Sequence, residues 1–482
     1  MERLRLCPAG RQRLSQAPHR AVQDRPLMLT ELERLLLQGQ RAIEAGDAAR
    51  ALIAADEVLK REPAQVDAMF QAGNAMMRAG NTGLALQFFN TARQATDKPH
   101  VLAACWNNIG ACLQDYRPDE AYQALLQALK YGEPRETYDN LCNVASQIGR
   151  HEEALSWADK SEKEARKDAS YNRSFALFNL GRWTEAWACF DRSIPQRDGA
   201  ARSFGFPRWD GKGGRPIVHG EQGIGDEILW ASLLPADFNG IIECEPRNET
   251  LFARSFPQAR VYGTRREQYI EWVDAEQPTH EIEMGGLGRL FAPEPFRRGA
   301  FLRADGPRVD AMSQWLRQMG EEVRVGIAWT GGSWSTGRAR RSVPFQEIKR
   351  LFDVPGVTFV NLEYENRREE LAGFPGVLDP RWATKKGADM DDLAALVASL
   401  HLVIAPTTSV VDLAGALGVE CWAMVDEHPQ WRYSPVAGPD AMWFYESVRC
   451  FRQQARDKGG WHRVVGMVKR ALLDRLEARQ AA

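Results

Sequence analysis

The sequence lacks the patterns that mark metal-binding, membrane-spanning and nucleic-acid-binding proteins. None of its eight cysteines forms a CxxC pair, and no two of its eight histidines stand in HxH or HxxxH spacing, so we expect no metal site. No segment reaches the about 18 to 20 continuous apolar residues that a membrane span needs. The 62 lysines and arginines are balanced by 64 aspartates and glutamates, which gives a net charge of −2. This balance argues against a nucleic-acid partner.

The scattered cysteines also bear on the compartment. Several stand in apolar helical patterns, where a free cysteine behaves as a small hydrophobic side chain, and this usage is typical of the reduced cytoplasm. Residues 1–29 are rich in arginine and lack the apolar core of a signal peptide. We expect a disordered leader there or, as the alternative, a start codon assigned too far upstream. With 482 residues, 44% of them apolar, the chain is long enough for two or three domains.

A repeat of about 34 residues runs through the first 200 residues. A turn pair such as Gly46-Asp47 or Gly80-Asn81 is followed each time by an alanine in the next helical stretch. Small residues there let two helices cross closely, and each helix pair leaves an apolar face that only its neighbour can cover. The pattern predicts an α solenoid of about five tetratricopeptide repeats over residues 30–195, with a generic helical bundle as the alternative. The recurring alanines are Ala51, Ala85, Ala121, Ala154 and Ala186.

Asparagines recur on the predicted first helices of these repeats. Solenoids of this kind commonly bind a protein or peptide on their concave face, and side-chain amides there suit an extended peptide backbone. We therefore predict that the asparagines bind an acceptor or client protein; the alternative is that they are solvated amides of a helix surface. The residues concerned are Asn74, Asn107, Asn108, Asn140 and Asn143.

The helix-pair pattern stops near Ile194. Residues 196–213 are rich in Gly, Pro and Arg and are predicted to be a linker. Beyond them, short apolar runs alternate with helical stretches, which predicts parallel, doubly wound sheets. We expect two Rossmann-like domains, at residues 214–305 and 306–482, with ligand loops at the strand ends. The expected strands are IVHG, FNGIIECE, ARVYG, VRVGIAW, VTFVNLEYE, LHLVIAP and ECWAMV.

The first candidate loop reads GEQGIGD, from Gly220 to Asp226. Gly223 and Gly225 have no Cβ, so the backbone can approach a ligand closely. Asp226 would stand at the start of the next helix, where a carboxylate can act as general base on an acceptor hydroxyl. The alternative is that Asp226 caps the helix in a tight turn.

The second candidate loop follows the strand VRVGIAW and begins with Thr330 and Gly331. It continues to Arg338, Arg340 and Arg341, whose guanidinium groups offer forked donors for phosphate oxygens. We predict that this loop binds the phosphates of a nucleotide. A solvated basic loop is the alternative.

The third candidate loop joins the strand LHLVIAP to the helix VVDLAGALG. Thr407, Thr408 and Ser409 stand at the start of that helix, where free N–H groups and the positive end of the dipole favour a diphosphate. Trp431 and Arg432, further on, either contact a ligand or pack the last strand.

Four segments, in this order, resemble one family. They resemble motifs of the heptosyltransferase family, which is glycosyltransferase family 9-like. The segments are HGEQGIGDEILWASLLP, VGIAWTGGSWSTGRARRSVPF, NLEYE and DLAGALGVECWAMVDEHPQWRY. The chain resembles a bacterial tetratricopeptide-repeat protein fused to a GT-B glycosyltransferase domain, and more distantly the O-linked N-acetylglucosamine transferase. The resemblance implies an inverting, metal-independent transfer from a nucleotide-diphosphate sugar, no cofactor, Asp226 as the base, and a client such as a flagellin-like protein.

The chain departs from this family at the third loop. The family usually carries an acidic residue before the threonine and a histidine in HLAGALG, whereas this chain has Thr407-Thr408 and Asp412. An aspartate beside a diphosphate would repel it. The departure implies weakened donor binding or an altered donor, unless Asp412 faces elsewhere or pairs with an arginine.

Three functions compete on the sequence alone. The first is an active glycosyltransferase whose repeats select a protein acceptor, which the GxGD motif and the three arginines favour. The second is a binding adaptor whose glycosyltransferase-like part has lost activity, which Asp412 favours. The third is a transferase that acts on a lipid or saccharide acceptor.

Overall fold

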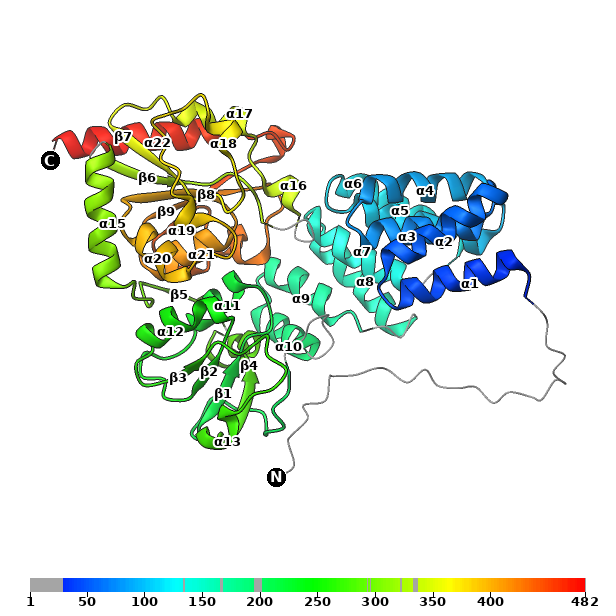
Figure 1. The fold of residues 1–482 in the computed structure, drawn as a ribbon, viewed down its shortest axis with the longest axis horizontal. Coiled ribbons are helices and arrows are strands. Elements are labelled where there is room, and N and C mark those ends of the chain that lie inside the picture. Colours follow the sequence, from blue (N-terminus) through cyan, green and yellow to red (C-terminus); the bar gives the residue numbers. More distant parts are fainter. Residues whose placement is uncertain are drawn as a thin grey trace. The chain divides into compact units, whose positions relative to one another are not determined.

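The computed structural model describes residues 29–132, 135–164, 168–194, 202–292, 294, 296–320, 323–332 and 337–481 (Figure 1). The predicted leader therefore lies outside the described residues, apart from Leu29. The chain divides into two compact units between Arg173 and Ser174, so the boundary falls inside a helix of the last repeat. We describe each unit separately.

The first unit consists of helix pairs, as the repeat pattern predicts. Thr30 caps the first helix, and its side chain and that of Glu33 bond to each other's backbone N–H groups, the reciprocal arrangement typical of a helix start. Ala51, Ala85 and Ala121 are fully buried at the helix crossings. The helices are α1 (Glu31–Glu44), α2 (Ala48–Arg61), α3 (Val66–Arg78), α4 (Thr82–Gln94), α5 (Pro99–Leu113), α6 (Pro118–Tyr131), α7 (Arg135–Gln147) and α8 (His151–Lys163).

Glycines close the turns within these pairs. Gly46, Gly80 and Gly149 have φ angles of 78°, 77° and 76°, a left-handed conformation that suits a residue without Cβ. In the third pair, the second helix, α6, instead begins at Pro118, whose fixed φ and missing N–H suit the first helical position.

The second unit begins within α9 (Ser170–Asn179), continues with α10 (Trp183–Ser193) and then contains two α/β domains. In the first domain the sheet order is β3-β2-β1-β4, with every pairing parallel. Strands β2 and β3 thus lie on one side of β1, and β4 lies on the other side. The strands are β1 (Pro216–His219), β2 (Ile241–Glu243), β3 (Arg260–Tyr262) and β4 (His280–Glu283), and the helices are α11 (Ile224–Ala231), α12 (Glu249–Ser255), α13 (Trp272–Glu276) and α14 (Leu287–Phe291).

The second domain contains a five-stranded parallel sheet in the order β11-β9-β8-β6-β7. Its order reverses between β6 and β8, and β5 (Arg297–Arg298) pairs with β10 (Phe444–Tyr445) outside this sheet. The strands are β6 (Val323–Ile327), β7 (Val357–Asn361), β8 (Leu402–Pro406), β9 (Cys421–Val425) and β11 (Val448–Arg452). The helices are α15 (Gly306–Met319), α16 (Arg338–Arg341), α17 (Phe345–Ile348), α18 (Arg368–Leu371), α19 (Arg381–Thr384), α20 (Met390–Ala398), α21 (Ser409–Ala416) and α22 (His462–Ala481).

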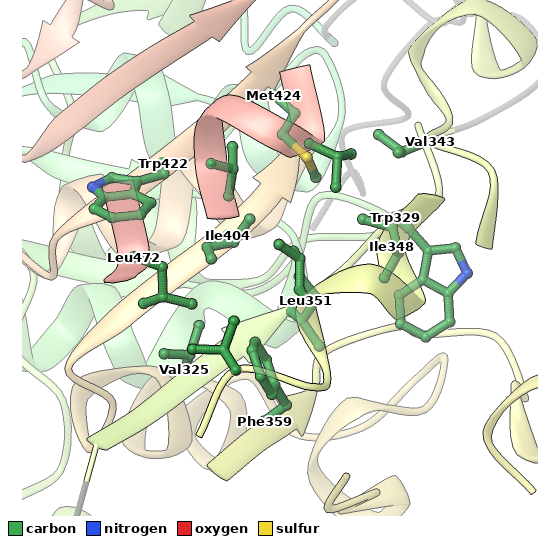
Figure 2. Packing of buried hydrophobic residues seen from close by; sticks show 14 of the residues in the cluster. Val325, Trp329, Val343, Ile348, Leu351, Phe359, Ile404, Trp422, Met424 and Leu472 are labelled. Carbon is green, nitrogen blue, oxygen red and sulfur yellow. The ribbon is translucent and has the colours of Figure 1, made fainter. Parts of the chain in front are cut away.

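A closely packed apolar core fixes the second sheet. Side chains from β6, β8 and β9, such as Val325, Ile404 and Trp422, meet Leu351 and Phe359 (Figure 2). The C-terminal helix α22 adds its apolar face to the same core. This core therefore supports the strands from which the candidate loops emerge. The core residues of α22 are Val464, Val465, Val468 and Leu472.

The structure differs from the sequence-based expectation in three places. Helix α11 begins at Ile224, within the expected loop Gly220 to Asp226, so Asp226 lies within its first turn. Strands β4 and β11 have no counterpart among the expected strands. Part of the predicted linker pairs with β4, because Trp209 N–H donates to Glu281 O at 2.8 Å; residues 195–201 lie outside the described part of the chain.

The cysteines and the lengths of the helices can be compared with the expectations from the sequence. The seven cysteines within the described residues are all buried, and none of them forms a disulfide, which fits their expected role as small hydrophobic side chains. Among the helices of the described ranges, none is both long enough and apolar enough to cross a bilayer.

Candidate functional site

All three candidate loops follow strands at the points where the two sheets reverse their order. The first loop follows β1, which lies between β2 and β4, and the second and third loops follow β6 and β8. In parallel α/β sheets, ligands bind beyond the carboxyl ends of the strands at such a reversal. The topology therefore puts all three loops where a ligand site is expected.

Helix α11 of the first domain meets helix α21 of the second at Gly225. A Cβ added to Gly225 would lie 2.9 Å from Ser409 Cβ and 3.0 Å from Asp412 Oδ2. The space that Gly225 leaves is therefore filled by the third loop and its helix. This contact brings the first and third candidate loops together.

Asp226 is held by two donors. Its Oδ1 accepts a hydrogen bond from Arg432 Nη2 at 2.5 Å, and its Oδ2 accepts one from the backbone N–H of Gly223 at 3.2 Å. The second contact is a helix cap, as in the alternative reading of this loop. The side chain is 26% exposed, so an acceptor hydroxyl can reach it.

Asp412 is a buried carboxyl in the same place. Its Oδ2 lies 3.9 Å from Arg432 Nη1, so it faces an arginine, one of the possibilities that the sequence leaves open. Its Oδ1 is buried and has no hydrogen-bond partner among the described residues. Burial raises the pKa of Asp412 to about 7; the guanidinium of Arg432 opposes the shift and the carboxylate of Asp226 adds to it. Asp412 is thus a titratable group near neutral pH.

The start of the second loop is held by protein groups. The N–H groups of Trp329 and Thr330 both donate to Glu363 Oε1 at 2.6 Å, and Thr330 Oγ1 accepts from Arg367 Nη2 at 2.5 Å. The N–H of Gly331 donates to Ser342 Oγ at 2.9 Å. These contacts hold residues 329–331 in place; residues 333–336 lie outside the described part.

The three arginines of the second loop have different surroundings. Arg338 forms a two-pronged pair with Glu365, with both N···O distances 2.6 Å. Arg341 is buried and donates to the carbonyl oxygen of Thr407, and this burial lowers its pKa. Arg340 has donors left for a ligand, because its buried Nε and Nη1 have no hydrogen-bond partner within the described residues.

Asp426 directly follows strand β9 and faces Arg340. Its Oδ2 lies 3.9 Å from Arg340 Nη1, and its buried Oδ1 lacks a hydrogen-bond partner in the described ranges. Burial raises the pKa of this carboxyl, against the pull of Arg340 and Arg341. The sequence reading missed Asp426, although an acidic residue immediately after a buried strand is a recognisable signal.

The third loop presents its polar groups at the start of α21. Thr407 is buried and its carbonyl oxygen is taken by Arg341. Thr408 occupies the cap position but makes no side-chain cap bond, and its buried Oγ1 has no hydrogen-bond partner among the residues described. Ser409 is exposed. Buried polar groups are usually paired, so these open atoms mark a place for a polar ligand.

Trp431 belongs to an aromatic cluster. Its ring stacks on Phe178 of α9, with centroids 4.3 Å apart, and on Trp230 of α11, with centroids 6.0 Å apart. Trp187 and Trp443 also contact it. The cluster joins the last repeat to both α/β domains, so Trp431 packs the fold while Arg432, next to it, enters the site.

The asparagines of the repeats form a chain of hydrogen bonds. Asn108 Nδ2 donates to Asn74 Oδ1 at 3.2 Å, and Asn107 Nδ2 donates to Asn108 Oδ1 at 3.1 Å. Asn107 Oδ1 accepts from Thr137 and Asn140, both at 3.0 Å. Asn143 bonds separately to Gln114 and Gln147. These amides thus help to hold neighbouring repeats together, and their binding of a peptide stays a prediction.

Metal ligands do not cluster in the described ranges. No group of three or more His, Cys, Asp or Glu side chains is arranged to hold an ion there. Metal-independent transfer stays a prediction.

One known protein is similar to most of this chain, and two solved structures are each similar to a part of it. Protein FlbA of Caulobacter vibrioides is 28% identical over 499 residues, which cover 89% of this chain and 82% of that protein. The structure of E. coli ADP-heptose LPS heptosyltransferase II is 14% identical with a TM-score of 0.39, and covers 56% of this chain and 100% of its own. YrrB, described as a TPR protein with an unusual peptide-binding site, is 20% identical with a TM-score of 0.27, over 33% of this chain and 83% of its own. No family model matches the chain.

Proposed function

We propose that this protein is a glycosyltransferase that moves a sugar from a nucleotide-diphosphate sugar to a protein selected by its repeats. One observation carries the proposal. Buried polar atoms of Thr408, Arg340 and Asp426 have no hydrogen-bond partner among the described residues. Thr408 and Asp426 follow the carboxyl ends of β8 and β9, and Arg340 Nη1 lies 3.9 Å from Asp426 Oδ2. A diphosphate and its nucleoside would supply the missing acceptors and donors.

The proposed chemistry uses these groups in a single displacement. Asp226 takes the proton of an acceptor hydroxyl, and the oxygen forms a bond to the anomeric carbon as the bond from that carbon to the diphosphate breaks. The electron pair leaves with the diphosphate, and attack from the opposite face inverts the anomeric centre. The N–H groups at the start of α21 and the guanidinium of Arg340 stabilise the departing charge.

No metal is required by this scheme, since protein donors take the charge of the leaving group. We place the reaction in the cytoplasm, in keeping with the buried cysteines of the described residues, which form no disulfide. By family resemblance alone, a flagellin-like protein is the first client to test.

The assay for this function measures the mass of a client. The full chain is incubated with a flagellin-like protein and a panel of nucleotide-diphosphate sugars, with EDTA in one series and Mg²⁺ in another. We expect a mass increase of one or more sugar residues on the client in both series, and none with Asp226→Asn. A client whose mass stays unchanged with every sugar contradicts the proposal for that client; transfer only with Mg²⁺ contradicts its metal independence.

A binding adaptor without transferase activity is the second candidate. It is favoured by the pairing of Asp226 with Arg432 at 2.5 Å, since this hydrogen bond occupies the carboxylate oxygen that would have to accept the proton. It predicts that residues 30–194 alone capture the same client as the full chain and that no sugar is transferred.

A further inference from the structure

The guanidinium of Arg432 makes a short hydrogen bond through one nitrogen and a longer ionic contact through another. Its Nη2 makes a short hydrogen bond of 2.5 Å to Asp226. Its Nη1 lies 3.9 Å from Asp412 Oδ2, which is too long for a hydrogen bond. Its buried Nε has no hydrogen-bond partner among the described residues. A guanidinium group has five N–H donors, so this one has capacity for another acceptor.

The backbone around Arg432 is fixed. Trp431 is locked in the aromatic cluster with Phe178 and Trp230, and Tyr433 is buried. The carbonyl oxygen of Arg432 accepts a hydrogen bond from Trp443 N–H at 3.1 Å. Any change of partner therefore involves a turn of the side chain and leaves the chain path in place.

The guanidinium lies beside the first turn of α21. Asp412, which it faces, stands in that turn, and Asp226 comes from the helix that crosses it at Gly225 and Ser409. This is the helix end at which the proposed function puts the diphosphate. A diphosphate there would compete with the single carboxylate of Asp226 for the guanidinium, because phosphate oxygens accept the two-pronged geometry of arginine well.

We propose that Arg432 is a donor-binding residue that exchanges partners: without a donor it pairs with Asp226, and a bound diphosphate draws it away and frees Asp226 to act as base. The inference rests on the proposed function. It assigns to one side chain both the binding of the leaving group and the timing of the base, so that Asp226 is released only when a donor is present.

A double-mutant cycle on nucleotide binding tests the exchange. Isothermal titration calorimetry with UDP, ADP, GDP and CDP, in EDTA, compares the wild type with Asp226→Asn, Arg432→Gln and the double variant. Because Asp226 competes for Arg432, Asp226→Asn should bind the preferred nucleotide at least fivefold more tightly. Arg432→Gln should bind at least tenfold more weakly, and the double variant should match Arg432→Gln within twofold.

Two controls separate the exchange from simpler effects. Asp353→Asn removes the same charge from a remote pair with Lys469 at 2.6 Å and should leave the affinity unchanged. If Asp226→Asn tightens binding as much in the Arg432→Gln background as in the wild type, simple repulsion explains the effect and the exchange is refuted.

Other outcomes are equally decisive. An unchanged affinity in Asp226→Asn overturns the exchange while leaving nucleotide binding, and hence the proposed function, intact. Failure of every folded variant to bind any of the four nucleotides removes both proposals. Should Arg432→Gln not fold, Arg432→Lys replaces it: lysine keeps the charge but loses the fork, so the tightening by Asp226→Asn should shrink to less than half.

Discussion

Gly225 and Ser409 pack directly against each other where the first α/β domain meets the second. A Cβ at position 225 would lie 2.9 Å from Ser409 Cβ and 3.1 Å from its Cα, closer than side chains approach. The absence of a side chain at Gly225 thus allows α11 and α21 to cross, and that crossing brings Asp226, Arg432 and Asp412 together.

Gly225→Ala should therefore destabilise the protein. Forcing a methyl group into a packed contact costs about 1 to 3 kcal/mol, which thermal or urea unfolding of the full chain would measure. Gly466→Ala is the matched control, since a Cβ at that position of α22 meets nothing within 4 Å and alanine should stabilise the helix by about 0.5 to 1 kcal/mol. Equal stability of the Gly225 variant and the wild type would show that the two helices part easily.

Arg340 and Arg338 should contribute differently to nucleotide binding. Arg340 has buried N–H donors without a hydrogen-bond partner among the described residues. Arg340→Ala should therefore weaken binding of the preferred nucleoside diphosphate by about 1 to 3 kcal/mol, the loss of a charge-assisted bond. Arg338 is already occupied by Glu365, so Arg338→Ala should cost less than about 0.5 kcal/mol. Titration calorimetry decides, and a larger loss in Arg338→Ala would mean that Glu365 gives up its arginine to the ligand.

Asp412 should make stability depend on pH. Burial raises its pKa from 3.8 to about 7, so the folded state holds this proton more tightly than the unfolded state. The stabilising effect is complete below about pH 4 and is lost as the pH rises to about 7. Between pH 5 and pH 8, Asp412→Asn should therefore gain about 2 to 3 kcal/mol relative to the wild type.

Urea unfolding at several pH values measures this difference. The groups whose charges act on Asp412 are Arg432, Asp226 and Arg341, and none of them is changed in the variant. Asp353→Asn is the control, because the hydrogen bond from Lys469 lowers the pKa of Asp353 and its effect should stay flat over this range. Parallel curves for Asp412→Asn and the wild type would show that Asp412 keeps an ordinary pKa.

Asn107 should matter for the stability of the solenoid. It is 8% exposed and accepts hydrogen bonds from both Thr137 and Asn140. Asn107→Ala leaves two donors without this acceptor and should cost about 1 to 3 kcal/mol. Among the described residues Asn74 accepts a single side-chain hydrogen bond, from Asn108, so Asn74→Ala should cost about 1 kcal/mol or less. Thermal unfolding compares the two, and the reverse order would assign the structural role to the other asparagine.

Local patterns in the sequence predicted most of the fold. The alanine and glycine spacing of the repeats and the apolar runs at β6, β8 and β9 are visible in short windows, because each depends on neighbours a few residues away. Strands β4 and β11 were missed since charged residues interrupt them, as in HEIE and VRCFR. Both lie at sheet edges, where polar side chains are common.

The site was less predictable because its contacts span the chain. Asp226 and Arg432 are 206 positions apart, and no local pattern reveals such a pair. The sequence reading therefore treated Arg432 as either a ligand contact or a packing residue, and it offered the pairing of Asp412 with an arginine only as one possibility. The loops themselves were found, because hydroxyls, glycines and arginines after buried strands are local signals.

The central claim is that the Ser174–Ala482 unit holds a nucleotide-diphosphate sugar, and a thermal-shift screen of the full chain tests it most directly. Purified protein is heated with free nucleoside diphosphates and their sugar conjugates in metal-free buffer, and binding to the folded state must raise the melting temperature. We expect a clear rise with one nucleotide class, and a smaller rise in Arg340→Ala. A panel without any shift, from protein shown to be folded, would contradict the central claim.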